Sequence, residues 1–269
     1  MWEKKDKNCD PSDPADRERG SYWDHVLLDV ESRLIVSIVV GRRTAETLQQ
    51  AFTDFYQRTD GALPPLITTD EYAAYFTVIV STYGVHKEDL EMTEAEKERY
   101  DWDAMPAVYF PVEIAYATVH KEREQGRVVR VEQRIICGTA EQVAEALAEG
   151  TTAASINTSY IERWNGTQRN FNARKARKTY CFSKELSFPI AVTWLCVAAY
   201  NFAWTPRTLR QRVQDDPPRY EYRTPAMAAG LAKQVWSLEE ILRYPMYQPK
   251  PRRPKRKSRK RKAMKVDGR

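Results

Sequence analysis

One carboxylate followed by a run of cations is the part of this sequence best suited to chemistry. Residues 162–185 read ERWNGTQRNFNARKARKTYCFSKE, in which Glu162 is followed by seven Lys or Arg and by no acid until Glu185. A carboxylate is the kind of hard oxygen ligand that Mg²⁺ prefers, and clustered cations suit the phosphates of nucleic acid. The pattern therefore favours metal-dependent chemistry on DNA.

Each half of this pattern has a purely structural alternative. Ser159 stands three residues before Glu162, so the pair also fits the S/T-x-x-E capping box at a helix N-terminus. The basic run also fits a solvated helix face. Under the functional interpretation, one helix bent near 165–166 presents its cations to phosphates: Arg163, Arg169, Arg174, Lys175, Arg177 and Lys178, with Lys184 beyond them. Trp164 and Phe171 are core residues by default, with stacking on an unpaired base as the alternative.

Asp70 is the second candidate ligand. It directly follows the apolar segment 66–69, LITT, and precedes a helical pattern over 71–84. Ligand sites in open α/β sheets gather at the carboxyl ends of strands, whereas the structural alternative is that Asp70 caps the following helix. Two or three carboxylates from separate elements are enough for Mg²⁺, and paired ions can assist both oxygens in phosphoryl transfer. Asp70 and Glu162 are therefore predicted to share a metal site.

The remaining pattern predicts an α/β chain that positions these acids. Residues 22–30 and 34–41 are short and rich in β-branched residues, which indicates a strand pair, and an amphipathic helix is expected to begin at Thr44. Further elements are expected as follows: helices over 139–148, 188–204 and 224–245, and a hairpin of 113–121 with 127–136. Apolar and charged residues alternate along 127–136, which predicts one solvated face. Segment 87–103 is acidic and is expected to be an exposed helix or loop.

Length and cysteine pattern limit the class of protein. With 269 residues, the chain has ample length for a real core. No apolar run approaches the ~20 residues of a membrane span and no signal peptide is recognisable, so a soluble intracellular protein is expected. The four cysteines show no C-x-x-C pairing, which argues against a disulfide framework and against a structural zinc site.

The net charge of +6 conceals two opposite regions. Residues 249–269 hold 12 of the 43 Lys and Arg and one of the 37 Asp and Glu, so residues 1–248 carry 31 basic and 36 acidic residues, a net charge of −5. The C-terminal tail, residues 246–269, lacks the apolar residues that would order it and is expected to be disordered. It suits phosphate backbones, although such tails also bind RNA or anionic lipid.

Four blocks of the chain, taken in order, carry a family resemblance. They are WDHVLLDVESRLIVSIVVGRRT, LITTDEYAAY, INTSYIERWNGTQRNFNARKARKTYCFSK with YNFAW, and TPAMAAGLAKQVWSLEEIL, and they span nearly all of residues 22–245. They resemble the DDE transposases of bacterial insertion sequences, in particular the insertion-sequence-one-like group. The resemblance implies a ribonuclease-H-like mixed sheet flanked by helices, Mg²⁺ or Mn²⁺ as cofactor, and DNA cleavage and strand transfer. It maps the family's second Asp onto Asp70 and its Glu onto Glu162.

The first Asp of the family's three has no counterpart under this resemblance. In the implied fold three antiparallel strands precede the first helix and the first Asp lies on strand one, but only two strand segments precede Thr44 here. Family members carry a D-E-x-W strand before the loop that resembles residues 3–20, and Met1-Trp2 stands in its place. Residues 1–21 are therefore interpreted as a polar loop that follows a missing first strand, with the β-hairpin as an insertion in the catalytic domain, residues 22–245.

Asp29 and Asp24 are the acids considered as substitutes. Asp29 precedes the turn at residues 31–33, where a turn-forming role is the alternative to metal ligation. Asp24 stands at the start of its strand, beside Trp23, and is the weaker candidate. The histidines are isolated, which favours surface or core roles for all three: His25, His86 and His120.

The sequence thus leads to a transposase catalytic domain that is incomplete and is expected to be inactive as it stands. Its expected partners are transposon ends, target DNA and further copies of itself on DNA, in the bacterial cytoplasm at the nucleoid and not at a membrane. The first alternative is a non-catalytic DNA-binding remnant that interferes with full-length enzyme. The second is an unrelated Mg²⁺ nuclease, because fold alone does not determine the reaction. The family's usual N-terminal module for reading transposon ends has no recognisable counterpart in this sequence.

Overall fold

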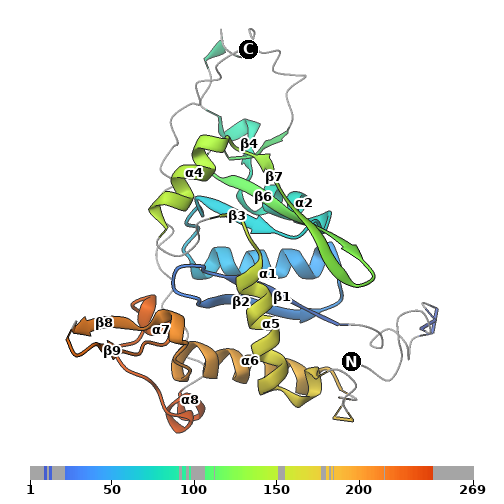
Figure 1. The fold of residues 1–269 in the computed structure, drawn as a ribbon. Coiled ribbons are helices and arrows are strands. Elements are labelled where there is room, and N and C mark those ends of the chain that lie inside the picture. The colour runs from blue at the N-terminus through green and yellow to red at the C-terminus, as the bar shows by residue number, and fades with distance from the viewer. Residues whose placement is uncertain are drawn as a thin grey trace.

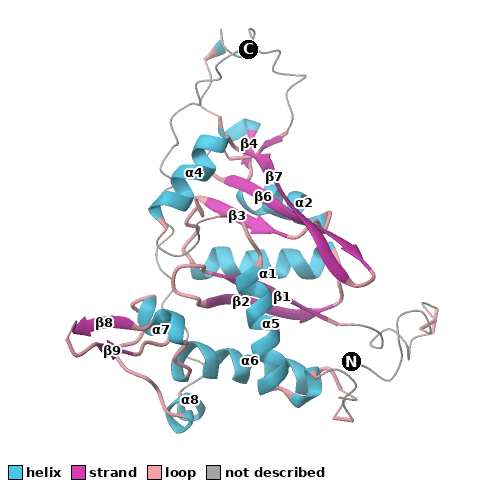
Figure 2. Cartoon of the chain, in the orientation of Figure 1, coloured by secondary structure: helices cyan, strands magenta, loops and turns pink. Residues whose placement is uncertain are grey.

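The computed structural model describes residues 9–10, 12–13, 22–90, 93–94, 97, 107–111, 113–150, 155–176, 180–181, 183, 185–214 and 216–244. Within these ranges the chain is a mixed α/β structure in which helices flank the strands (Figure 1, Figure 2). The expectations for the basic tail, for most of the N-terminal loop and for most of segment 87–103 fall outside the described residues.

The first two strands form an antiparallel hairpin, as the sequence predicts. β1 (Trp23–Leu28) pairs with β2 (Ile35–Gly41). Asp29 closes the connection, because its carboxylate accepts hydrogen bonds from the backbone N–H of Glu31 (3.3 Å) and of Ser32 (3.0 Å). Short acidic side chains stabilise turns by bonding the backbone two residues on. The turn-forming role of Asp29 is confirmed.

A second, three-stranded sheet holds the long central strand of the molecule. β3 (Leu66–Thr69) pairs in parallel with β6 (Ala115–Glu124), and β6 pairs in antiparallel fashion with β7 (Arg127–Cys137). The strand order β3-β6-β7 makes this a mixed sheet, which confirms the predicted α/β class and the predicted hairpin. In the described part of the chain no strand pairing joins it to the β1–β2 hairpin.

Helices α1 (Ala45–Arg58) and α2 (Ala74–Tyr83) share one core with residues from both groups of strands. Leu48 and Phe52 of α1 form the centre of this core, and Leu27 of β1 and Ile67 of β3 both pack against it. Burying side chains of this size stabilises a fold by about 1.5–3 kcal/mol each. The α1 helix therefore connects the hairpin to the three-stranded sheet.

On the three-stranded sheet, α4 (Ala140–Glu149) packs from the opposite side to α1. It begins with a capping box between Thr139 and Gln142 and packs Val143 against the small residues of β6. This cover does not extend to β7, where Val129 and Val131 are both exposed. The prediction of a single solvated face is therefore wrong for β7, because α4 packs on β6 and leaves the edge strand bare.

Helix α5 (Ser159–Phe171) runs from the three-stranded sheet past the hairpin towards α6 (Ser187–Ala198) (Figure 1). The π-helical turn η6 (Ala199–Ala203) continues α6. Trp164 of α5 and Tyr200 of η6 pack edge to face, 4.8 Å between ring centroids, over the buried apolar residues of β2. Trp164 is therefore a core residue, as expected by default.

One helical run, Ser187–Leu209, is long and apolar enough to cross a membrane by length and composition. Its hydropathy over the most apolar window is only 1.2, and 33% of that window is buried in the protein. The sequence-based statement that no apolar run approaches membrane length is corrected by this helix. Within this run, Val197 and Tyr200 pack against the buried apolar residues of β2.

The remaining elements are short. They are β4 (Val85–His86), η3 (Lys87–Asp89), β5 (Val108–Tyr109), η5 (Ala173–Lys175), η7 (Arg207–Leu209), β8 (Gln211–Gln214), β9 (Arg219–Glu221), α7 (Pro225–Ala228) and α8 (Leu238–Arg243). The last two helices lie within the segment predicted to be helical. Ser237 and Glu240 form a capping box at the start of α8.

Candidate active site and nucleic-acid interface

Asp70 lies immediately after β3, at the carboxyl end of the strand, as the sequence predicts. Its side chain is 61% exposed, and its Oδ1 accepts a hydrogen bond from the Tyr72 N–H (3.3 Å). Helix α2 begins only at Ala74, and its N-cap residue Ala73 makes no side-chain capping bond. The helix-capping alternative is therefore wrong for Asp70, whose carboxylate faces solvent.

Arg43 joins Asp70 to β1. Its guanidinium lies 4.0 Å from Asp70 Oδ2 and stacks over the rings of Trp23 (4.8 Å) and Tyr72 (4.6 Å). Cation–π contacts of this kind are worth about 0.5–1 kcal/mol at exposed sites. The sequence alone suggests only a helix-entry or surface charge for Arg43. The sequence does contain one indication of the contact between Arg43 and Trp23: Arg43 lies two residues after Gly41, which pairs with Trp23 across the hairpin.

Glu162 lies in the first turn of α5 and forms an ion pair with Lys121 of β6. Lys121 Nζ also donates to Thr158 Oγ1 (3.0 Å), which fastens the start of the helix to the sheet. The capping-box alternative is wrong, because the N-cap of α5 is Thr158 and makes no side-chain capping bond. Ser159 instead donates through its hydroxyl to Asn157 Oδ1 (2.6 Å). The Glu162 side chain, 57% exposed, is free of any capping role.

The register of β3 on β6 indicates how far apart the two acids lie along the sheet. Strand β3 ends opposite Thr118, so Asp70 follows level with the next position of β6, and Lys121 lies two positions beyond that. Residues two apart share one face of a strand and are separated by about 7 Å. The sheet register and the start of α5 thus bring Asp70 and Glu162 to the same end of the sheet, although they are far apart in sequence.

The carboxylates of Asp70 and Glu162 are the kind of ligand that a hard divalent cation prefers. Mg²⁺ takes carboxylate oxygens and keeps several waters, and both acids are open to water. Each acid is, however, neutralised by a cation of the protein, Arg43 beside Asp70 and Lys121 beside Glu162. Among the described residues, no three His, Cys, Asp or Glu side chains group closely enough to hold a metal ion. A bound ion would therefore depend on these two carboxylates and on water.

Two tyrosines close to Asp70 are held in the neutral state. Burial raises the pKa of Tyr75 far above its usual range, and the charge of Asp70 adds to this effect. Burial also raises the pKa of Tyr116, whose hydroxyl shares a hydrogen bond with Thr69 Oγ1 (3.0 Å). Neither phenol ionises near neutral pH, so neither is suited to act as a general base.

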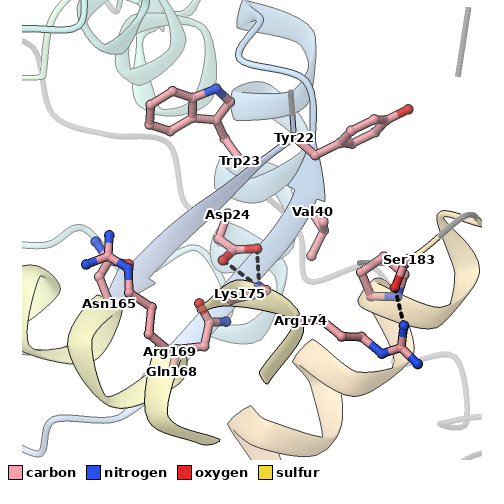
Figure 3. Close-up of a pocket in the computed structure, with 11 residues that line it drawn as sticks. Tyr22, Trp23, Asp24, Val40, Asn165, Gln168, Arg169, Arg174, Lys175 and Ser183 are labelled. Carbon is pink, nitrogen blue, oxygen red and sulfur yellow. Dashed lines mark hydrogen bonds and ion pairs between the residues drawn. The ribbon is translucent and has the colours of Figure 1, made fainter. Parts of the chain in front are cut away.

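A cavity of about 250 Å³, lined by both charged and apolar side chains, lies between β1, α5 and η5 (Figure 3). At its base, Lys175 Nζ lies 2.6 Å from both carboxylate oxygens of Asp24. The side chains of Lys175 and Asp24 are only 17% and 15% exposed. The buried amide of Gln168 completes the group, donating to Asp24 Oδ2 (2.7 Å) and accepting from Lys175 Nζ (3.0 Å). Sequence reasoning did not foresee this long-range pair.

Burial and the Asp24 carboxylate have opposite effects on the pKa of Lys175 at the base of the cavity. Burial lowers the pKa of Lys175, and the neighbouring Asp24 carboxylate opposes this by favouring the charged ammonium. Burial likewise raises the pKa of the nearby Cys196 thiol. Desolvation disfavours the charged form of any group. The attraction between the Lys175 ammonium and the Asp24 carboxylate offsets this cost, so both groups can stay charged although they are largely buried.

Four of the seven predicted DNA contacts are among the described residues: Arg163, Arg169, Arg174 and Lys175. The other three, Arg177, Lys178 and Lys184, lie outside them. The single bent helix that was expected is wrong, because α5 runs unbroken through Gly166 and ends at Phe171. Asn172 explains the break, since its Oδ1 accepts from the Arg174 N–H (3.0 Å) and starts the separate turn η5.

These four cations do not share one exposed face. Arg163 and Arg169 are exposed on α5, whereas Arg174 is partly buried and donates to Ser183 Oγ (2.7 Å). Lys175 is committed to Asp24. Of these four cations, Arg169, Arg174 and Lys175 line the cavity and Arg163 does not.

His25, His120 and Phe171 each contact other parts of the protein. His25 is buried, its Nε2 lies 2.9 Å from the Arg42 carbonyl oxygen, and burial lowers its pKa. His120 pairs with Glu71 on the surface. Phe171 is partly exposed and packs edge to face on Trp204, 5.3 Å between centroids.

The chain was compared with protein families, with curated proteins and with solved structures. No family model, no curated protein and no solved structure matches this chain.

Proposed function

We propose that this chain is a DDE-type transposase domain that acts with Mg²⁺ or Mn²⁺ on the phosphodiester bonds of transposon ends and target DNA. Its partners are DNA and further copies of the chain on that DNA, and its compartment is the bacterial cytoplasm. The observation that supports the proposal most is the position of the two acids: Asp70 directly follows the end of β3, Glu162 is paired with Lys121 of the neighbouring strand β6, and neither acid is used as a helix cap. The four ordered sequence blocks support it independently.

The residues have separate roles under this proposal. Asp70 and Glu162 would hold the metal, which when bound supplies charge stabilisation to the oxygens of the phosphoryl group. Arg43 and Lys121 now neutralise these acids. They are placed to turn towards a DNA phosphate once a metal takes over that charge. Arg163 and Arg169, exposed on α5, would contact the phosphate backbone on either side.

The experiment is plasmid nicking in the presence of Mn²⁺ by the whole chain, with Asp70→Asn and Glu162→Gln as isosteric variants. Loss of second-shell partners already costs 10–100-fold at metal sites, so each variant should lose at least about 100-fold of any nicking. Arg58→Gln is the matched control, because Arg58 is an exposed cation whose contacts are with Asp54 on α1 and with the Trp194 ring rather than with either acid. Nicking that persists unchanged in both acid variants would refute the site assignment.

A second candidate is a DNA-binding domain without catalysis, which interferes with a complete transposase. The observation that favours it is that both acids carry their own protein cation, which satisfies their charge without a metal. DNA binding that is retained without nicking, and that is unaffected by Glu162→Gln, would favour this candidate over the first.

A further inference from the structure

The cavity at Asp24 and Lys175 has the composition of a small anion site. Its charged lining consists of Asp24, Arg169, Arg174 and Lys175. Asp24 and Lys175 cancel one another at the base, so the two arginines leave a surplus of two positive charges. Arg174 uses one donor for Ser183, and a guanidinium has five. Donors therefore remain for an anion such as a phosphate.

An aromatic surface borders the same cavity. Trp23 lines it, and the indole is 49% exposed, while Arg43 stacks on the ring at 4.8 Å. Base–aromatic stacking is a general means of holding unpaired nucleotides and tolerates any base. Figure 3 shows Asp24 and Lys175 pointing at one another, with Arg169 and Arg174 on either side of the pair. A nucleotide suits this arrangement, because its phosphate can contact the two arginines while its base stacks on the Trp23 ring.

The size of the cavity limits the ligand. Its volume of about 250 Å³ lies below the roughly 300–1,000 Å³ of sites for drug-sized molecules. One nucleotide fits this space better than a length of duplex does. Gln168 and Asp24 at the base are buried and already bonded to each other and to Lys175, so a ligand would occupy the outer part, between the arginines and the ring.

The cavity is also physically connected to the acids of the proposed site. Glu162, Asn165 and Arg169 are spaced i, i+3 and i+7 along α5, which places them on one face of the helix. The rise from Glu162 to Arg169 is about 10 Å, the span of roughly three stacked nucleotides. On the other side, Arg43 contacts both Asp70 and the Trp23 ring. A strand whose phosphate lies at the acids reaches the cavity within a few nucleotides.

We infer that this cavity receives a single unpaired terminal nucleotide of a DNA strand, with its base against Trp23 and its phosphate between Arg169 and Arg174. The inference rests on the proposed action on DNA and names the part of the substrate held beside the acids. It requires no covalent step, and binding should occur without a metal ion.

Calorimetric titration of the whole chain with deoxyadenosine 5′-monophosphate, deoxyadenosine and inorganic phosphate tests this inference. The monophosphate should bind more tightly than either half. Trp23→Ala and Arg169→Ala should each weaken its binding by at least about fivefold, the lower end of what one base stack supplies. Arg58→Ala is the matched control, since Arg58 is an exposed cation on α1 that does not line the cavity, and it should leave the monophosphate affinity unchanged.

A second arm uses DNA itself. A duplex with a three-nucleotide single-stranded overhang should bind more tightly than a blunt duplex. That advantage should vanish in Trp23→Ala and in Arg169→Ala. Arg163→Ala should weaken both duplexes equally and keep the advantage. Thermal melting of each variant verifies that the fold is intact.

Several results would overturn the inference. They are equal affinity for phosphate and monophosphate, no measurable monophosphate binding, or equal loss of monophosphate affinity in Arg58→Ala and Arg169→Ala. The outcome is separable from that of the nicking assay. Nucleotide binding without nicking counts against the proposed catalysis alone, and nicking without nucleotide binding counts against the cavity alone.

Discussion

The Asp24–Lys175 pair makes the sharpest prediction about stability, because removing one partner differs from removing both. Lys175→Met leaves the Asp24 carboxylate, only 15% exposed, with Gln168 as its remaining partner. Breaking a buried ion pair costs about 3–5 kcal/mol. Since this pair borders a cavity that is open to water, the lower figure applies, and we expect a loss of about 3 kcal/mol in the free energy of unfolding.

Urea denaturation measures this loss. With a denaturant dependence of about 3 kcal/mol per molar urea for a chain of this size, the midpoint should fall by about 1 M. The double variant Asp24→Asn, Lys175→Met should recover most of the loss and lie within about 1 kcal/mol of wild type, because replacing both charges leaves neither stranded.

Two results would refute this reasoning. A loss below about 1 kcal/mol in Lys175→Met would show that the pair behaves as an ordinary surface ion pair. A double variant as unstable as the sum of the two single variants would show that each side chain acts through other contacts. In either case the short distances of 2.6 Å between Lys175 Nζ and the carboxylate oxygens would not reflect an energetically coupled pair.

Three further predictions follow from other contacts. Asn201 accepts from the Ile35 N–H (3.1 Å) and donates to its carbonyl oxygen (2.9 Å), so Asn201→Ala should cost about 2–4 kcal/mol in urea unfolding, and a loss under 1 would contradict it. Burial lowers the pKa of His25 from 6.5, so the folded state binds fewer protons than the unfolded state below about pH 6.5, and the free energy of unfolding should fall as the pH drops through that window. The variant His25→Gln should reduce this dependence on pH, as measured by thermal melts between about pH 7 and pH 5. The same pH dependence in the variant and in wild type would contradict this prediction. Lys121→Met frees Glu162 from its ion pair and should tighten Mn²⁺ binding by up to about fivefold, the worth of an exposed pair, as measured by calorimetry; an unchanged affinity would remove Glu162 from the metal site.

Much of the local structure could be predicted from the sequence. The segment LITT is a strand from Leu66 to Thr69, and Asp70 stands at its end. The capping box at Ser237 is formed, and the turn at Asp29 uses its carboxylate. Each of these features depends on residues a few positions apart, where the periodicity of side chains and the geometry of one or two backbone bonds decide the outcome.

The same local reasoning failed where a distant partner competed. Ser159 and Glu162 have the spacing of a capping box, but the Lys121 ammonium offers Glu162 a charged partner that a neutral backbone amide does not match. The alternation in β7 predicts a buried apolar face, but burial depends on whether another element covers the strand. Spacing alone contains no information about either neighbour.

The sequence by itself determined the α/β class, the strand pair, the hairpin, the position of Asp70 at a strand end and the position of Glu162 at a helix start. Only the tertiary structure decided that Glu162 meets Lys121, that Arg43 joins Asp70 to Trp23, and that Asp24 and Lys175 close the base of one cavity. The physical reason is that these contacts are set by sheet register and by helix packing. Both depend on the whole core, and neither leaves a periodic trace in the chain.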